Sequence, residues 1–295
     1  MKLIYEEYWY RLMEIPKFSF KTQKDEAYEF YKNNGAVIFT DLIDKSLIND
    51  ARNELKELIQ MQIGKHLDKT KQLMEANGFD EGFIEYSNHD ENLRERFYNI
   101  SKQLPSLHQI AGQKHVINAC KELGIEKPLL DAPQFRIDKP QDSRFLIKHH
   151  QETRGTKSTR MINMITAVSD IPKERGALSI ALGSQKLGPI SPTFDDSSKY
   201  QYIDPKYYEK DYPPQQAPLK AGETLMFNMY LCHGSMPNVT NATRWQIIVR
   251  VEDGTVMPYL DGEDVLDEKF NLEKARCPTC NSVTRPSLAF STADN

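Results

Sequence analysis

The chain has 295 residues, a formal net charge of −4 at pH 7 and 39% hydrophobic residues. This length is sufficient for one large domain with a buried core, and the negative charge argues against a general nucleic-acid-binding protein, which is usually basic. No apolar run approaches the length needed to span a membrane, and the acidic start of the chain is unlike a secretory signal, so we expect a soluble cytoplasmic protein.

The part of the chain before residue 133 is predicted to be mainly helical. Residues 1–20 are rich in aromatic side chains and are expected to pack as an arm, while residues 20–132 form a helical layer. The pattern predicts a strand at 35–40 and helices at 24–33, from about 47 to 59, and between 92 and 123 with a break at Pro105. These helices should cover one face of a sheet, and we assign no chemistry to them.

Residues 133–252 show the pattern of a β-rich core, with short apolar strands separated by polar turns. Such a succession is typical of a jelly roll, the architecture of cupins and their relatives. The predicted strands are Gln134–Ile137, Phe145–Glu152, Met161–Val168, Leu178–Ala181, Thr224–Leu231 and Arg244–Glu252. We therefore expect a single domain in which a β core is covered on one side by the N-terminal helices.

The four-residue stretch His149-His150-Gln151-Glu152 suggests a metal-binding strand. Residues i and i+2 of a strand project to the same face. One face would offer His149 and Gln151, an imidazole and a neutral amide, whereas the other would offer His150 and Glu152, an imidazole and a carboxylate. The second pair is the better partner for a divalent cation.

A third ligand is predicted at His233, which ends a run of alternating apolar residues that should face the core. Two histidines and one carboxylate leave three coordination positions open, as in non-haem Fe(II) oxygenases. Eleven residues later, Arg244 opens another predicted strand. Its planar guanidinium can bind a carboxylate through two nitrogen atoms. Each histidine alone is more often structural than a ligand, so the prediction depends on the full set.

The same residues carry a family resemblance. His-x-Glu at 150–152, a Gly-Ala-Leu to Gly-Ser turn at Gly176–Ser184, and His-Gly-Ser-x-Pro-Asn followed by Arg244 resemble the phytanoyl-CoA dioxygenase-like family over roughly residues 20–252. Members of that family are Fe(II)- and 2-oxoglutarate-dependent oxygenases with a double-stranded β-helix. The chain departs from the usual pattern at Glu152, where aspartate is usual, and at Gln185, where histidine often stands.

The resemblance implies a set of roles for these residues. His150, Glu152 and His233 would bind Fe(II), and Arg244 and Ser235 would hold a carboxylate of 2-oxoglutarate, with O2 as the other co-substrate. Hydroxylation of a small molecule is the expected outcome. Desaturation, cyclisation and epimerisation use the same kind of site, and a cupin-like metal-dependent isomerase or lyase, or a non-catalytic binding module, are the alternatives from other classes.

Two segments remain outside this core. Residues 186–220 contain six prolines and five tyrosines and are predicted to form an ordered lid, with a surface excursion as the alternative. Residues 253–295 form a C-terminal extension in which Cys277 and Cys280 supply only half of a structural zinc site. The default interpretation of these two cysteines is a pair of incidental thiols that bind no metal.

The expected substrate is polar and anionic, for example a nucleotide-linked sugar, a carboxylic acid or a CoA thioester. Seven basic residues against three acidic ones lie between Arg136 and Arg160, in a chain whose total charge is negative. Such a cluster attracts anions, although a solvated charge run is the alternative. We expect Arg154, Lys157 or Arg160 to contribute to substrate binding, with no nucleic acid or membrane as partner.

Overall fold

The computed structural model describes residues 14–66, 83–84, 87–88, 92–143, 146–153, 156–193 and 201–257. Most of the predicted N-terminal arm, Arg154, and the cysteine pair of the C-terminal extension lie outside these residues. Within the described part, no helix is long and apolar enough to cross a membrane.

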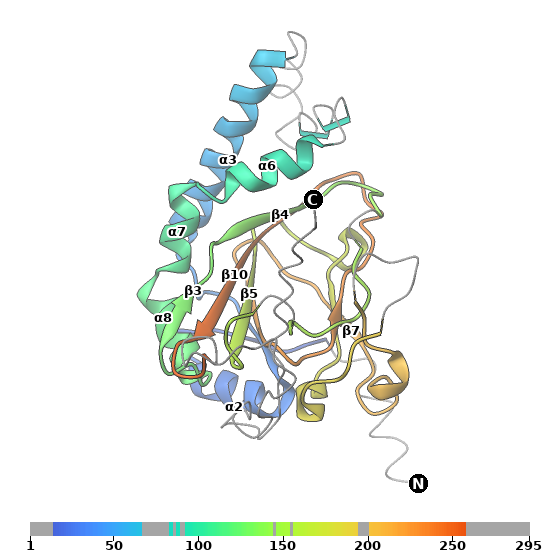
Figure 1. Ribbon diagram of the computed structural model, residues 1–295. Helices are drawn as coiled ribbons and strands as arrows, with labels where there is room; N and C mark the ends of the chain where they lie inside the picture. Colours follow the sequence, from blue (N-terminus) through green and yellow to red (C-terminus); the bar gives the residue numbers. More distant parts are fainter. Residues whose placement is uncertain are drawn as a thin grey trace, which may run out of the picture.

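Two β-sheets form the centre of the structure (Figure 1). The larger has the order β1-β2-β8-β5-β10-β3, with β4 also paired to β10, and the smaller has the order β7-β6-β9. The strands are β1 (Lys17–Phe18), β2 (Ala36–Phe39), β3 (Pro128–Leu130), β4 (Gln134–Asp138), β5 (Met161–Ala167), β6 (Leu178–Ile180), β7 (Gln215–Ala217), β8 (Thr224–Asn228), β9 (His233–Gly234) and β10 (Arg244–Asp253). Strands β4, β5, β8 and β10 are antiparallel to their neighbours in the larger sheet.

The predicted helical layer is present and covers the outer face of the larger sheet (Figure 1). Its helices are α2 (Lys24–Asn34), α3 (Lys45–His66), α6 (Leu93–Ser101), α7 (Pro105–Ala111) and α8 (Lys114–Glu122). Pro105 is the first residue of α7, a position where its missing N–H leaves no helical hydrogen bond unmade. The predicted break at this proline is therefore a helix start.

Alternation along the strands divides the core into two layers. Trp245, Ile247 and Val249 of β10 pack with the helices, together with Met164 of β5. The residues of opposite parity, such as Ile165 of β5 and Ile248 of β10, pack towards the smaller sheet. Period-two alternation in a sheet with two covered faces produces this arrangement. The face between the sheets, called the inner face below, is where the polar residues of the predicted site lie.

The segment predicted as a strand at 145–152 is not a regular strand in its described residues. His150 alone forms an isolated antiparallel bridge, to His233. The neighbouring backbone groups bind different segments, because the His149 carbonyl accepts from the amide of Ile203 and the Glu152 amide donates to Met229. The segment is thus held by three partners instead of one strand.

The predicted strand 224–231 is also shorter than expected. Strand β8 ends at Asn228, whose side-chain carbonyl accepts a hydrogen bond from the amide of Tyr230 while its backbone carbonyl accepts from Leu231. Asparagine side chains form such turns readily. His233 therefore belongs to a separate short strand, β9, but its ring still packs on Phe227 of β8, with 4.7 Å between the ring centroids.

The segment predicted as a lid contains regular structure in its described residues. Thr193 pairs with Tyr202, a 3-10 turn spans Pro205–Tyr207, and β7 adds an edge strand to the smaller sheet. The Ile203 amide donates to the His149 carbonyl, so the segment touches the chain immediately before the first predicted ligand.

Candidate metal and co-substrate site

The two histidines of the predicted site face each other across an antiparallel bridge. The His150 amide donates to the His233 carbonyl at 2.8 Å, and the His233 amide donates back to the His150 carbonyl at 3.0 Å. Residues that exchange both hydrogen bonds in this way stand directly opposite each other. Their imidazole rings lie with centroids 4.3 Å apart.

The residues between the predicted ligands take the opposite frame, as the alternation predicted. The ring of His149 contacts the Ser179 hydroxyl at 2.9 Å and lies beside Tyr208, with ring centroids 5.7 Å apart. Burial, with the nearby His233 and His150, lowers the pKa of His149 to about 4. His149 is thus a neutral residue of the packing between the lid and the smaller sheet.

Gln151 is buried in the same frame as His149 and joins three segments through its amide. Its Nε2 atom donates to the carbonyls of Gly188 and Tyr230, both at 2.8 Å, and its Oε1 atom accepts from the Ile190 amide at 2.8 Å. An amide that makes these three bonds in a buried position holds residues 188–190 against the segment that carries two of the predicted ligands.

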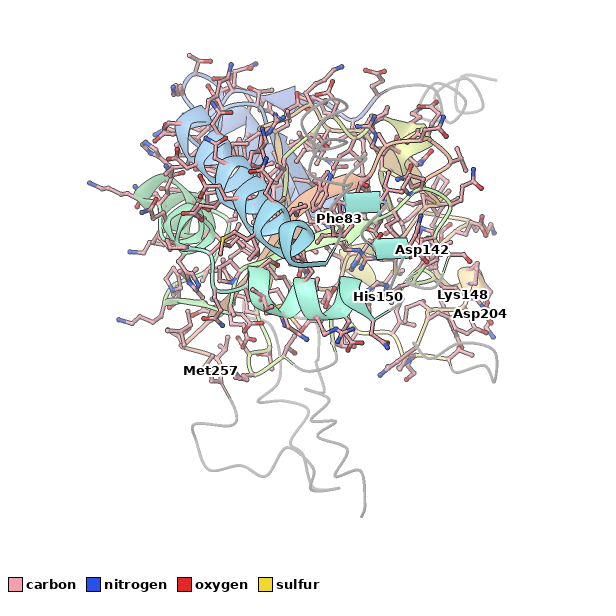
Figure 2. The ribbon with its side chains drawn as sticks, turned by 90° about the horizontal axis from the view of Figure 1, so that it is seen from above. Phe83, Asp142, Lys148, His150, Asp204 and Met257 are labelled. Atoms are coloured by element: carbon pink, nitrogen blue, oxygen red, sulfur yellow. The ribbon has the colours of Figure 1, made fainter. Side chains whose placement is uncertain are left out.

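The three predicted ligands come together beside the bridge that joins the backbones of His150 and His233; the third is Glu152. Their candidate ligand atoms all lie within 4.8 Å of one another. The Glu152 Oε1 atom is 3.6 Å from Nε2 of His150 and 3.5 Å from Nε2 of His233. His233 is buried, whereas the side chains of His150 and Glu152 are 19% and 17% exposed. One ion can therefore contact all three groups and still be reached from solvent. His150 is labelled in Figure 2, together with Lys148.

The remaining imidazole nitrogens are held by the backbone. Nδ1 of His150 lies 2.9 Å from the Lys148 carbonyl, and Nδ1 of His233 lies 2.9 Å from the Leu231 carbonyl. A carbonyl only accepts, so each Nδ1 carries a proton and Nε2, which faces Glu152, is the nitrogen available to a metal. Metal-binding histidines are oriented in this manner.

The Glu152 carboxylate is charged despite its surroundings. Burial by itself would raise its pKa, but the charge of the nearby Arg250 guanidinium holds the pKa well below its ordinary value. Oε2 of Glu152 accepts from Nη2 of Arg250 at 3.4 Å. The donor set of two imidazoles and one carboxylate is the set that suits Fe(II) in oxygenases, so the residues fit this metal.

Arg244 lies buried on the inner face and is paired with an acidic residue. It stands directly opposite Asp138 of β4, and its Nε and Nη2 atoms donate to Asp138 Oδ2 at 3.1 and 2.8 Å. The two residues are only 3% and 6% exposed. The Nε–Nη2 edge of the guanidinium is thus bound to Asp138, although the sequence suggested it for a co-substrate carboxylate. The Nη1 atom lies towards Gly176.

A second arginine completes this cluster. Arg136 of β4 donates from Nε to Asp138 Oδ2 at 3.1 Å and from Nη2 to the Ser235 hydroxyl at 3.4 Å. Ser235 follows β9 and lies two residues after the predicted ligand His233. Two arginines and one aspartate therefore meet at this position.

The other basic residues of the sequence cluster are dispersed. The Arg160 guanidinium is 7% exposed and donates from Nη1 to Asp253, Glu126 and the Gly124 carbonyl. Lys157 is exposed, and its amide donates to Glu252. Arg154 lies outside the described residues.

Sequence reasoning did not assign Arg136, Asp138 or Arg250 to the site. The alternation of side chains along each strand could have indicated them. Arg136 and Asp138 share one face of β4, and Arg244 and Arg250 share one face of β10. The register that brings the two faces together was not visible in the sequence. Asn163 of β5 belongs to the same face, opposite Arg250, and its buried Nδ2 atom has no hydrogen-bond partner among the described residues.

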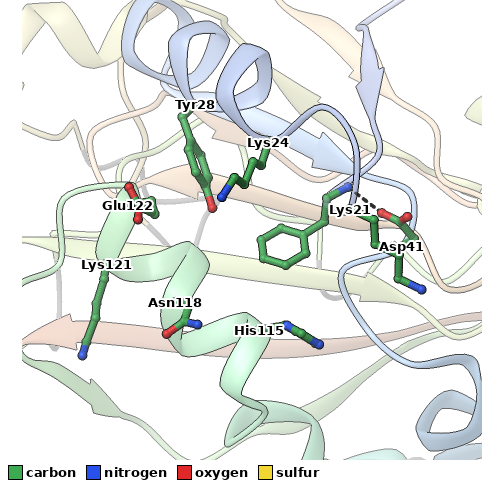
Figure 3. A pocket seen from close by; sticks show the side chains of 9 residues that line it. Lys21, Lys24, Tyr28, Asp41, His115, Asn118, Lys121 and Glu122 are labelled. Carbon is green, nitrogen blue, oxygen red and sulfur yellow. Dashed lines mark hydrogen bonds between the residues drawn. The ribbon is translucent and has the colours of Figure 1, made fainter.

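A separate pocket of about 590 Å³ lies on the helical side, between α2 and α8 (Figure 3). It is lined by Phe20, Lys21, Lys24, Tyr28, Asp41, His115, Asn118, Lys121 and Glu122. Asp41 is bound to the Phe20 amide and the Ser19 hydroxyl, and none of the lining residues belongs to the metal site. The helical layer thus has a pocket of its own without touching the predicted ligands.

Solved structures share this fold at low sequence identity. The epimerase SnoN from nogalamycin biosynthesis, in complex with Fe³⁺ and alpha ketoglutarate, is 15% identical, with a TM-score of 0.54 over 80% of this chain and 85% of that one. The carbocyclase SnoK from the same biosynthesis is 14% identical, with a TM-score of 0.53 over 81% and 87%. EctD from S. alaskensis with bound Fe is 12% identical, with a TM-score of 0.54 over 78% and 77%.

The family comparison covers most of the chain. The profile of the phytanoyl-CoA dioxygenase family matches residues 31–245, a span that includes the predicted ligands, Ser235 and Arg244. The β-rich fold, the His–Glu–His cluster and this match agree with the resemblance seen in the sequence. The chain therefore belongs to the phytanoyl-CoA dioxygenase family of Fe(II)- and 2-oxoglutarate-dependent oxygenases.

Proposed function

We propose that this oxygenase hydroxylates a small anionic metabolite, with His150, Glu152 and His233 binding Fe(II) and Arg244 and Ser235 binding 2-oxoglutarate. The observation that carries the proposal is the approach of three ligand atoms within 4.8 Å in a structure that also holds the buried Arg244–Asp138 ion pair. Fe(II) with 2-oxoglutarate and O2 would supply the oxidising chemistry. The residues of the protein would bind and orient the metal, the co-substrate and the substrate, and would exclude water.

The Arg136–Asp138–Arg244 cluster suits one carboxylate of the co-substrate. A buried guanidinium without compensation is costly, and Asp138 offsets one of the two positive charges. The two guanidinium groups attract a carboxylate, and the Ser235 hydroxyl adds a further polar group beside Arg136. In this proposal Asp138 fixes the position of Arg244, and the Arg136 guanidinium and the Nη1 side of Arg244 face the carboxylate.

The unpaired amide of Asn163 also supports a bound ligand on the inner face. Buried amide nitrogens nearly always have a hydrogen-bond acceptor. The Asn163 Nδ2 atom has none among the described residues, and the residue stands in register with Phe227, whose ring packs on His233. A carboxylate or carbonyl oxygen of a ligand beside the metal would satisfy this donor.

Basic residues near the predicted ligands support an anionic substrate. Lys148 lies two residues before His150 and stacks over Tyr202 of the lid, 4.6 Å from the ring centroid. Lys157 is exposed, and Arg154 lies between it and Glu152 in the sequence. Arg160 is the weakest of the proposed contacts, because its guanidinium is already bound to Asp253 and Glu126.

An anaerobic titration tests the metal and co-substrate roles. Addition of Fe(II) and 2-oxoglutarate to the metal-free protein should give a weak visible charge-transfer band, and this band should be absent in His150→Ala, Glu152→Ala and His233→Ala. His149→Ala, in the opposite frame, should keep the band. A band that survived Glu152→Ala but not His149→Ala would show that the ligand frame is wrong, and a metal-binding protein without the band would favour an isomerase or lyase.

A substrate screen tests the remaining part. Succinate release should be stimulated by anionic compounds more than by matched neutral ones, and the stimulation should weaken at high salt, because screening reduces attraction between charges. Lys148→Met and Lys157→Met should raise the substrate concentration needed, while Arg160→Met should change it least. Stimulation by neutral compounds alone, without salt dependence, would contradict the anionic substrate.

A further inference from the structure

Glu152 presents its two carboxylate oxygens to different partners. Oε1 faces the two imidazoles, at 3.6 Å from His150 and 3.5 Å from His233. Oε2 points the other way and accepts from Nη2 of Arg250 at 3.4 Å. The oxygen that would bind the metal is therefore distinct from the oxygen that is already bound by the protein.

The position of Arg250 is fixed by the sheet. It lies in the middle of β10, on the face that also carries Arg244, and it pairs in register with Asn163 of β5. The Arg250 side chain is 30% exposed and that of Glu152 is 17% exposed. The proximity of Glu152 raises the pKa of Arg250, so the guanidinium stays charged at any physiological pH. A permanent cation on a central strand thus holds the far oxygen of the carboxylate.

We propose that Arg250 is a positioning residue that keeps Glu152 bound to the metal through one oxygen only. This inference rests on the proposed metal site. Glutamate has one more rotatable bond than aspartate, so its carboxylate can turn to bring both oxygens to one ion. With Oε2 held by Arg250, the second oxygen cannot take a further coordination position. Three positions then remain for the co-substrate and O2.

The experiment counts metal-bound water in the full-length protein loaded with Mn(II), by water-proton relaxation and without co-substrate. In Arg250→Met, which has similar length but no donor, Glu152 should bind through both oxygens, and the number of bound waters should fall by about one third, from three to two. Arg250→Lys, which keeps a cation and an N–H donor, should retain the wild-type number.

Two controls separate positioning from charge. Arg136→Met removes a cation from the same face without touching Glu152, and its water number should equal that of the wild type. In a Glu152→Asp background the shorter side chain does not reach Arg250, so adding Arg250→Met should change nothing further. Non-additivity of this kind identifies an interaction between the two side chains.

The outcomes are distinct. An unchanged water number in Arg250→Met, or an equal fall in Arg136→Met, would overturn the role of Arg250 and leave the metal site intact. A wild-type protein that binds no Mn(II) would overturn the metal site itself, and this inference with it. The readout needs no turnover, so a missing substrate cannot obscure the result.

Discussion

Arg244 and Asp138 stand directly opposite each other on β10 and β4 and form a buried ion pair at 2.8 Å. Replacing Arg244 with alanine should raise the 2-oxoglutarate requirement about 30-fold, corresponding to about 2 kcal/mol, the lower end of the range for removing one partner of a buried charged pair. Metal affinity should change much less, because no ligand atom is lost.

The measurement is the 2-oxoglutarate dependence of succinate formation, with Ni(II) binding followed by calorimetry on the same variant. Arg244→Lys is the matched substitution, since it keeps the charge but loses the pair of nitrogens that binds Asp138. We expect it to lie between wild type and Arg244→Ala. A folded Arg244→Ala that loses metal and co-substrate affinity equally would reduce Arg244 to a structural residue.

Gly176 should be needed for the position of Arg244. Its φ angle is +77°, and a Cβ atom there would lie 2.7 Å from Nη1 of Arg244 and 2.4 Å from the carbonyl oxygen of Met236. Gly222 has a similar φ angle of +86° but open space around the added atom. Gly222→Ala should therefore cost only the conformational strain of about 1–2 kcal/mol.

Gly176→Ala should cost more stability than Gly222→Ala and should also raise the 2-oxoglutarate requirement. Urea unfolding and the co-substrate titration measure the two effects on both variants. Equal stability losses and unchanged co-substrate affinity in Gly176→Ala would show that Arg244 moves freely away from the added methyl group.

Gln151 should control the order of the start of the lid segment. Gln151→Leu removes the acceptor of the Ile190 amide and the donor to Gly188. We expect faster hydrogen exchange at Ile190, because exchange reports local opening of such bonds. Gln216→Leu is the control, since Gln216 binds the carbonyls of Lys173 and Ala177 instead. Unchanged exchange at Ile190 in Gln151→Leu would contradict this role.

Asp253 is predicted to be a structural residue of β10. Its side chain is fully buried and accepts hydrogen bonds from the amides of Glu126, Lys127 and Thr255, from the Thr255 hydroxyl and from Arg160. Asp253→Asn should lower the free energy of unfolding by about 3 kcal/mol, because it leaves the buried Arg160 with only the exposed Glu126 as a charge partner. The exposed Asp170, in Asp170→Asn, should cost less than about 1 kcal/mol.

The same residue gives a pH dependence. Burial alone would raise the pKa of Asp253, but its hydrogen bonds with backbone amides lower it. A lowered pKa in the folded state means that the stabilisation is present near neutral pH and is lost as the pH falls through the folded-state pKa. Wild type should therefore lose more stability than Asp253→Asn on acidification, and parallel curves for the two proteins would contradict the prediction.

The sequence predicted the ligand frame because alternation is a local property. His150 and Glu152 lie on one side and His149 and Gln151 on the other, even though the segment is not a regular strand. Alternation requires only an extended backbone, so it survived the loss of a continuous strand partner. The expected strand itself was wrong, because the polar contacts that hold this segment come from three other parts of the chain.

The co-substrate cluster was only half predictable. Arg244 was visible through its distance from His233, but Asp138 and Arg136 depend on the register between β4 and β10. Register is set by contacts between strands that are far apart in sequence, and one amino-acid sequence does not display it. For the same reason Arg250 appeared to be one more charged residue of a strand, although it lies within hydrogen-bonding distance of a predicted ligand.

The reciprocal bridge between His150 and His233 has a consequence for how such an enzyme can change. The spacing of the two imidazoles is set by a pair of backbone hydrogen bonds, which any two amino acids could make, and not by the length of the chain that connects them. Insertions or deletions in the exposed part of the connection should therefore leave the spacing of the histidines unchanged. Engineering a new substrate preference should begin in the chain between His150 and His233, because the spacing of the two imidazoles does not depend on its length.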